Sequence, residues 1–112
     1  MEAPGGAQRR RSPRILWRTS ILVNWLGDGG LTVREQAETE IVNAHGALLR
    51  LPAALERGQA VELLHPTSNE SQNARVVWTQ ESAGGWVSAG VELKEPSATF
   101  WGINIPIRGS HL

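Results

Sequence analysis

The sequence of 112 residues contains no cysteine. Disulfide frameworks, thiolate metal sites and cysteine nucleophiles are therefore excluded. The absence of disulfides fits a reducing cytoplasm, which is the location that we expect. No apolar run approaches the roughly 18 residues that a membrane-spanning helix needs, and the N-terminus lacks the apolar core of a signal peptide. We therefore expect no membrane span.

Net charge is also lacking, because eleven Lys and Arg residues balance eleven Asp and Glu residues. A neutral protein has no general attraction to nucleic acid, so we do not expect nucleic acid as a partner. The charges are nevertheless unevenly placed. Residues 9–14 (RRRSPR) hold four arginines and no acid, whereas five glutamates follow between residues 35 and 62. Guanidinium groups bind phosphates in a bidentate manner and stack on flat rings. The cluster is therefore either a ligand-binding arm or a solvated basic tail.

Residues for catalysis or metal binding are scarce. The three histidines, His45, His65 and His111, have no metal-ligand spacing between them, and no nucleophile is paired with a base. The glycine-rich segment 27–30 predicts a hairpin turn rather than a phosphate loop, because no Lys-Ser/Thr pair follows it. The sequence therefore favours a binding domain over an enzyme, and we expect no cofactor and no metal.

Short segments rich in β-branched and aromatic residues alternate with turn signals along the chain. They predict six strands, at residues 14–26, 31–42, 47–51, 59–65, 73–80 and 86–93. No segment has the cap and apolar period of a long helix, although residues 96–102 predict a short helical turn. We therefore predict an all-β fold, a six-stranded antiparallel β-barrel with a short C-terminal helical turn and a flexible basic N-terminal arm.

The domain organisation follows from these segments. We expect a disordered leader at residues 1–8, a barrel domain at residues 9–103 that includes the arm 9–14, and a tail at residues 104–112. With five Trp, one Phe and no Tyr, the aromatic core must come mainly from tryptophan. Trp78, Trp86 and Trp101 are expected in this core, but an exposed Trp near the arm can instead stack on a base.

Several separated motifs occur in a characteristic order. Two arginines in an RxxxR pattern, Arg10 and Arg14, precede the first strand, and the bend at residues 41–48 (IVNAHGAL) follows the second. The segments LERGQAVEL, ARVVW and GVEL come later in the chain. Over roughly residues 9–102 this arrangement resembles the PilZ domain family, a bacterial six-stranded β-barrel.

The resemblance implies a receptor for the second messenger cyclic di-GMP. In that family, an RxxxR loop and a (D/N)xSxxG turn clasp the ligand together. Gly46 matches the glycine of the turn, which puts Asn43 at the serine position and Ile41 at the Asp/Asn position. A local slip would instead let Asn43 fill the Asp/Asn role with His45 nearby. The ligand-binding residues that the resemblance implies are Arg10, Arg14, Asn43, Gly46, Arg9, Arg11 and His45.

Three functions remain open from the sequence. The first is a cyclic di-GMP effector or adaptor in bacterial signalling, in which the arginine arm clasps the ligand against the barrel and an unidentified protein partner senses the change. The second is a degenerate PilZ-like domain that does not bind the nucleotide and acts by protein contacts in pilus assembly or motility. The third is a small nucleic-acid-binding barrel, against which the net neutrality argues.

Overall fold

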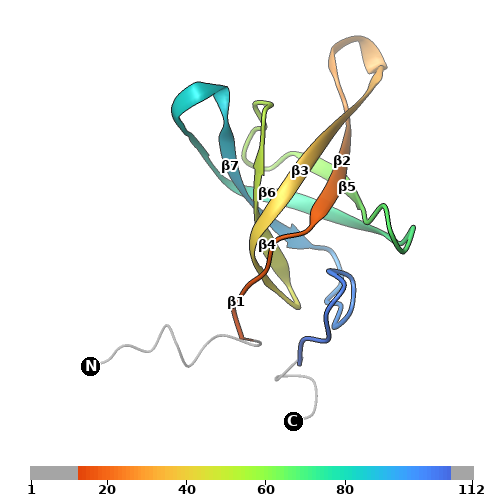
Figure 1. Ribbon diagram of the computed structural model, residues 1–112. Coiled ribbons are helices and arrows are strands. Elements are labelled where there is room, and N and C mark those ends of the chain that lie inside the picture. The colour runs from red at the N-terminus through yellow and green to blue at the C-terminus, as the bar shows by residue number, and fades with distance from the viewer. Residues whose placement is uncertain (1–12, 107–112) are drawn as a thin grey trace.

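Seven antiparallel strands form one sheet in the structure, a computed structural model that describes residues 13–106 (Figure 1). The strands are β1 (Ile15–Leu16), β2 (Ser20–Leu26), β3 (Thr32–Asn43), β4 (Gly46–Leu51), β5 (Ala60–Leu64), β6 (Ser71–Glu81) and β7 (Val87–Leu93). Their order is β1-β3-β2-β5-β6-β7-β4, and an additional pairing of β3 with β4 closes the sheet. The predicted all-β, six-stranded antiparallel barrel is confirmed, with β1 as one strand outside it.

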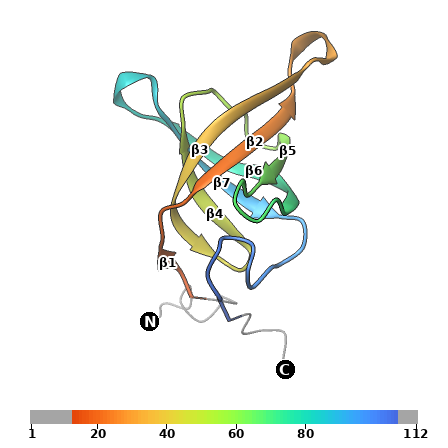
Figure 2. The ribbon, with the colours of Figure 1, turned by 45° about the vertical axis from the view of Figure 1, so that its right-hand side comes forward.

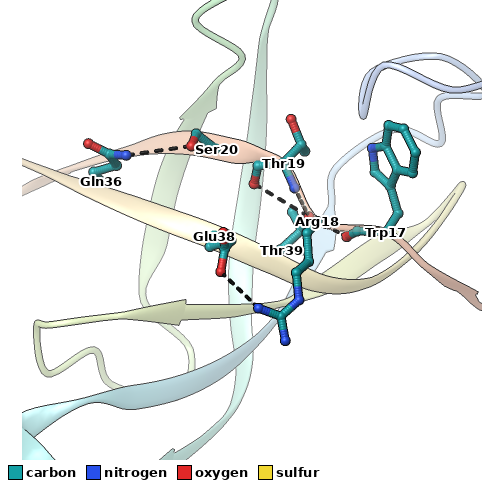
Figure 3. A network of polar contacts seen from close by, with 7 residues as sticks. All are labelled: Trp17, Arg18, Thr19, Ser20, Gln36, Glu38 and Thr39. Carbon is teal, nitrogen blue, oxygen red and sulfur yellow. Dashed lines mark hydrogen bonds and ion pairs between the residues drawn. The ribbon is translucent and has the colours of Figure 1, made fainter.

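The extra strand arises because the predicted strand 14–26 is interrupted at residues 17–19. At this interruption the hydroxyl of Thr39 donates to the Trp17 carbonyl oxygen at 2.6 Å and accepts from the Thr19 amide at 2.9 Å (Figure 3). A side chain of β3 therefore replaces part of the regular ladder. Alternation of residue types does not reveal such a contact, so the interruption was not predicted.

Two long hairpins extend from the same end of the barrel (Figures 1 and 2). They are β2–β3, which turns through the short 3₁₀ segment Asp28–Gly30, and β6–β7, which turns through Ala83–Gly85. Gly29 and Gly84 have φ values of 78° and 77°, in the left-handed region that glycine adopts without a steric penalty. The turn at residues 27–30 was predicted correctly, and the second turn lies between the predicted strands 73–80 and 86–93.

The opposite end of the barrel is covered by residues 96–106 (Figures 1 and 2). Phe100, Trp101 and Ile105 of this segment are buried, and Trp101 is the largest fully buried side chain among the described residues. The short turn predicted here is a single hydrogen-bonded turn, in which the Gly102 amide donates to the Thr99 carbonyl oxygen at 3.1 Å. Within residues 13–106 we find no helix that is long and apolar enough to cross a membrane.

The expectation of a core position was correct for Trp101 and wrong for Trp78 and Trp86. These two side chains are 44% and 37% exposed. In β6 the register shifts between Val76 and Trp78, because Val77 forms a bulge. Val77 and Trp78 consequently both face outward, although neighbouring residues of a regular strand face opposite sides.

Candidate functional site

One row of apolar side chains crosses the outer face of the barrel. The strand registers place Leu16 beside Ile41, Ile41 beside Leu48, Leu48 beside Gly90, and Gly90 beside Trp78. The core residues Val42, Val76 and Val91 occupy the opposite face of the same strands. The row therefore presents apolar surface to solvent across β1, β3, β4, β7 and β6.

A parallel row is polar and lies two residues away along β3, β4 and β7 and three residues away along β6, where the bulge adds one residue. It places Asn43 beside Gly46, Gly46 beside Glu92, and Glu92 beside Arg75. Continuing the register of β1, in which Leu16 lies beside Ile41, brings Arg14 next to Asn43. The barrel thus sets charged groups along one border of an apolar strip.

A groove of about 480 Å³ lies over these two rows. It is lined by Arg14, by the turn between β3 and β4 with its flanking residues, and by the outward positions of β6 and β7. Gly90 deepens the floor because it has no side chain, and Trp78 forms an aromatic wall beside it. A flat apolar surface bordered by a guanidinium group suits a planar ring that carries anionic substituents.

The turn beside the groove is held by the side chain of Asn43. Its Oδ1 atom accepts hydrogen bonds from the amides of His45 at 2.8 Å and of Gly46 at 2.9 Å. This arrangement is an Asx turn, in which a side-chain oxygen takes the place of a backbone carbonyl. The oxygen of Asn43 is therefore already engaged by two donors of its own turn.

His45 and Gly46 also line the groove. The Nε2 atom of His45 is buried and has no hydrogen-bond partner among the described residues. A Cβ atom at Gly46 would overlap the carbonyl oxygen of Val91 on β7. The glycine is thus required by the close approach of two strands, in addition to any role in ligand binding.

The C-terminal segment 96–106 is hydrogen-bonded to the β3–β4 turn. The indole Nε1 of Trp101 donates to the Asn43 carbonyl oxygen at 2.9 Å, and the Ser97 amide donates to the Ala44 carbonyl oxygen at 2.8 Å. The Trp101 carbonyl oxygen in turn accepts from the indole Nε1 of Trp17, also at 2.9 Å. Trp101 therefore connects the N-terminal side of the groove to the turn. No sequence signal pairs Trp17 with Trp101, which lie 84 residues apart.

Among the residues that the resemblance implied, the structure brings together Arg14, Asn43, His45 and Gly46 at one groove. Arg9, Arg10 and Arg11 lie outside the described residues. Arg18 is not part of the groove, since its guanidinium group pairs with Glu38 at 3.4 Å on the exposed surface (Figure 3).

Trp78, Gly90 and Glu92 are among the groove residues that sequence reasoning did not place in the site. Their signal lay in the outward positions of the ARVVW and GVEL segments, but the bulge at Val77 concealed it in β6. Within residues 13–106, no group of three or more His, Asp or Glu side chains is arranged to hold a metal ion.

A second depression, of about 1060 Å³, is lined mainly by residues of β2, β5 and β6 and by the segment after β7. Its charged lining is mixed and consists of Glu62, Arg75, Glu92 and Lys94. The amide of Asn24 in this depression is already bonded to Glu62 at 3.1 Å and to Arg34 at 2.7 Å. Because Arg14 and Gly46 line the smaller groove and not this depression, the smaller groove is the candidate site.

No curated protein matches the sequence. The family model of the PilZ domain matches residues 8–100, a range that contains all seven strands and both arginines of the RxxxR pattern. The chain therefore belongs to the PilZ domain family, a class of binding domains that act as cyclic di-GMP effectors.

Proposed function

We propose that the groove binds cyclic di-GMP and that the protein is an effector or adaptor in bacterial second-messenger signalling. The observation that carries the proposal is the position of Arg14. It borders the same groove as Asn43 and Gly46, although these residues come from two separate parts of the chain. One arginine of the RxxxR loop and two residues of the turn thus line one surface.

The groove offers chemistry for both parts of such a ligand. The exposed face of Trp78 and the open floor at Gly90 can accept a stacked purine. Arg14 can pair in a bidentate manner with the O6/N7 edge of guanine or with a phosphate. Nothing in this binding requires a nucleophile, a metal or a cofactor, so we expect a receptor without catalytic activity.

The remaining arginines complete the proposal. Arg9, Arg10 and Arg11 precede Arg14 in the chain and would close over the bound nucleotide. Closure of the arm changes the surface that the protein presents to a partner protein. A ligand that binds the closed form more tightly shifts the population towards it.

Isothermal titration calorimetry with cyclic di-GMP tests this function. We expect saturable binding by the wild-type protein, and Arg14→Ala should weaken it by about 10- to 100-fold, the range for losing a hydrogen bond to a charged group. Arg18→Ala is the matched control, because Arg18 is also exposed but pairs with Glu38 away from the groove. Absence of heat at tens of micromolar ligand and low salt would exclude the proposed function.

A second candidate function is a protein-docking domain without nucleotide binding. It is favoured by Ile41, which offers no acceptor to a guanine edge, and by the engaged oxygen of Asn43. The exposed side chains of Val77 and Trp78 would then bind an apolar segment of a protein related to pili or motility. For this function we expect no nucleotide binding, together with capture of a protein by the wild type that Trp78→Glu abolishes and Trp86→Glu preserves.

A further inference from the structure

A guanine base in the groove lacks an obvious hydrogen-bond acceptor. Its N1–H and N2–H groups are two adjacent donors, and leaving such donors unpaired in a desolvated site weakens binding. Ile41 has no polar side-chain atom, and the Oδ1 atom of Asn43 already accepts two backbone amides. If the site selects guanine, another residue must supply the acceptor.

Glu92 is placed to supply it. Its side chain is exposed on the outer face of β7 and lines the groove. Across the sheet it lies between Gly46 on β4, which has no side chain to cover it, and Arg75 on β6, which does not line the groove. Among residues 13–106, we find no hydrogen bond or ion pair that engages the carboxylate of Glu92. The groove therefore contains one unengaged carboxylate acceptor next to its floor.

We propose that Glu92 is the residue that makes the site specific for guanine. The proposal rests on the proposed nucleotide-binding function of the same groove. The two oxygens of the carboxylate accept from N1–H and N2–H as a charge-assisted, bidentate pair. Arg14 and Glu92 are three strand spacings apart, about 14 Å, across β1, β3, β4 and β7. A base between them presents its O6/N7 edge to Arg14 and its N1/N2 edge to Glu92.

The negative charge of Glu92 should affect the affinities for guanine and adenine ligands in opposite directions. A carboxylate near the two phosphates of a cyclic dinucleotide repels them, so a purely electrostatic effect would lower affinity for every such ligand. Only a base with donors on this edge compensates for the repulsion. Adenine presents the lone pair of N1 at the corresponding position, and the carboxylate disfavours it.

Calorimetric titration with cyclic di-GMP and cyclic di-AMP, which share the same sugar-phosphate ring, tests the proposal. We expect the wild type to bind cyclic di-GMP at least about tenfold more tightly than cyclic di-AMP. This factor is the lower bound for a hydrogen bond to a charged group. Glu92→Ala should weaken the binding of cyclic di-GMP by that factor and leave the affinity for cyclic di-AMP unchanged or higher. Glu92→Gln keeps one oxygen acceptor, so its affinity for cyclic di-GMP should lie between those of the wild type and Glu92→Ala.

Glu81→Ala is the matched control, because Glu81 is exposed near the far end of β6 and does not line the groove. It should leave both affinities unchanged. Equal changes for both ligands in Glu92→Ala, or an unchanged affinity for cyclic di-GMP, would overturn the role of Glu92 while leaving the proposed function intact. Absence of cyclic di-GMP binding by the wild type would overturn the proposed function, and the role of Glu92 with it.

Discussion

Gly46 and Gly90 both face the groove but have different surroundings. A Cβ atom at Gly46 would overlap the backbone of Val91, whereas a Cβ atom at Gly90 would make ordinary contacts of 3.6 to 3.8 Å with Val77 and Trp78. The strand pair β4–β7 therefore tolerates a side chain at one position and not at the other. The difference separates a structural glycine from one that only leaves the groove open.

We expect Gly46→Ala to lower the free energy of unfolding by about 2 kcal/mol or more, because β4 and β7 must move apart. Gly90→Ala should change it by less than about 1 kcal/mol, since Ala fits the strand and loses less backbone entropy than Gly. Urea denaturation followed by tryptophan fluorescence measures both. Equal destabilisation by the two variants would contradict the contact at Gly46.

Trp78 and Trp86 are exposed to a similar degree but differ in their neighbours. Trp78 lines the groove, whereas Trp86 packs under the guanidinium group of Arg50 at 4.6 Å. Base–aromatic stacking contributes about 1–3 kcal/mol per base. Trp78→Ala should therefore weaken the binding of cyclic di-GMP roughly tenfold or more. Trp86→Ala should leave binding unchanged. Equal affinities for wild type and Trp78→Ala would exclude stacking on this ring.

At the scale of elements, the structure is held together where segments far apart in the chain meet. Trp17, at the interruption between β1 and β2, donates to the carbonyl oxygen of Trp101 in the C-terminal segment. Trp101 donates to Asn43, whose side chain holds the β3–β4 turn. This chain of hydrogen bonds links three elements around the candidate site.

Trp17→Phe removes one indole N–H of this chain and keeps an aromatic ring. We expect the free energy of unfolding to fall by about 1 kcal/mol, the typical net contribution of one hydrogen bond. The amides of Trp17 and Thr19, which are bonded to the Glu40 carbonyl oxygen and the Thr39 hydroxyl, should exchange faster with deuterium. Trp86→Phe, at the same exposed fraction of 37%, is the control. Unchanged exchange at residues 17 and 19 would contradict the role of Trp17.

For the whole molecule, the β3–β4 turn, which lines the groove, lies towards the end of the barrel that carries β1 and the C-terminal segment, away from the tips of the two long hairpins (Figures 1 and 2). Closure of the arginine arm should therefore affect one end of the barrel. We expect cyclic di-GMP to slow amide exchange in residues 7–16 and to leave the turn at residues 27–31 unchanged. Hydrogen–deuterium exchange with mass spectrometry measures both regions. Unchanged exchange in residues 7–16 at saturating ligand would contradict closure of the arm.

The strands and their turns could be predicted because each depends on local patterns. Ile21 and Val23 alternate with outward residues in β2, and Gly29 and Gly84 mark turns that need a left-handed backbone. The outward position of Trp78 could not be predicted, since a bulge shifts the alternation without a residue type that marks it. The interruption at residues 17–19 depends on a side chain from β3, Thr39.

The sequence by itself determined the all-β architecture, the hairpin turns and, through its motifs, the family, because these follow from periodicity, backbone preference and residue order. Only the tertiary structure decided which side chains share the groove. Arg14, Asn43 and Glu92 come from three parts of the chain and line one groove because the strand registers align them across the closed sheet. The structure likewise shows that the Oδ1 atom of Asn43 accepts hydrogen bonds from its own turn. Glu92 is the carboxylate that lines the groove.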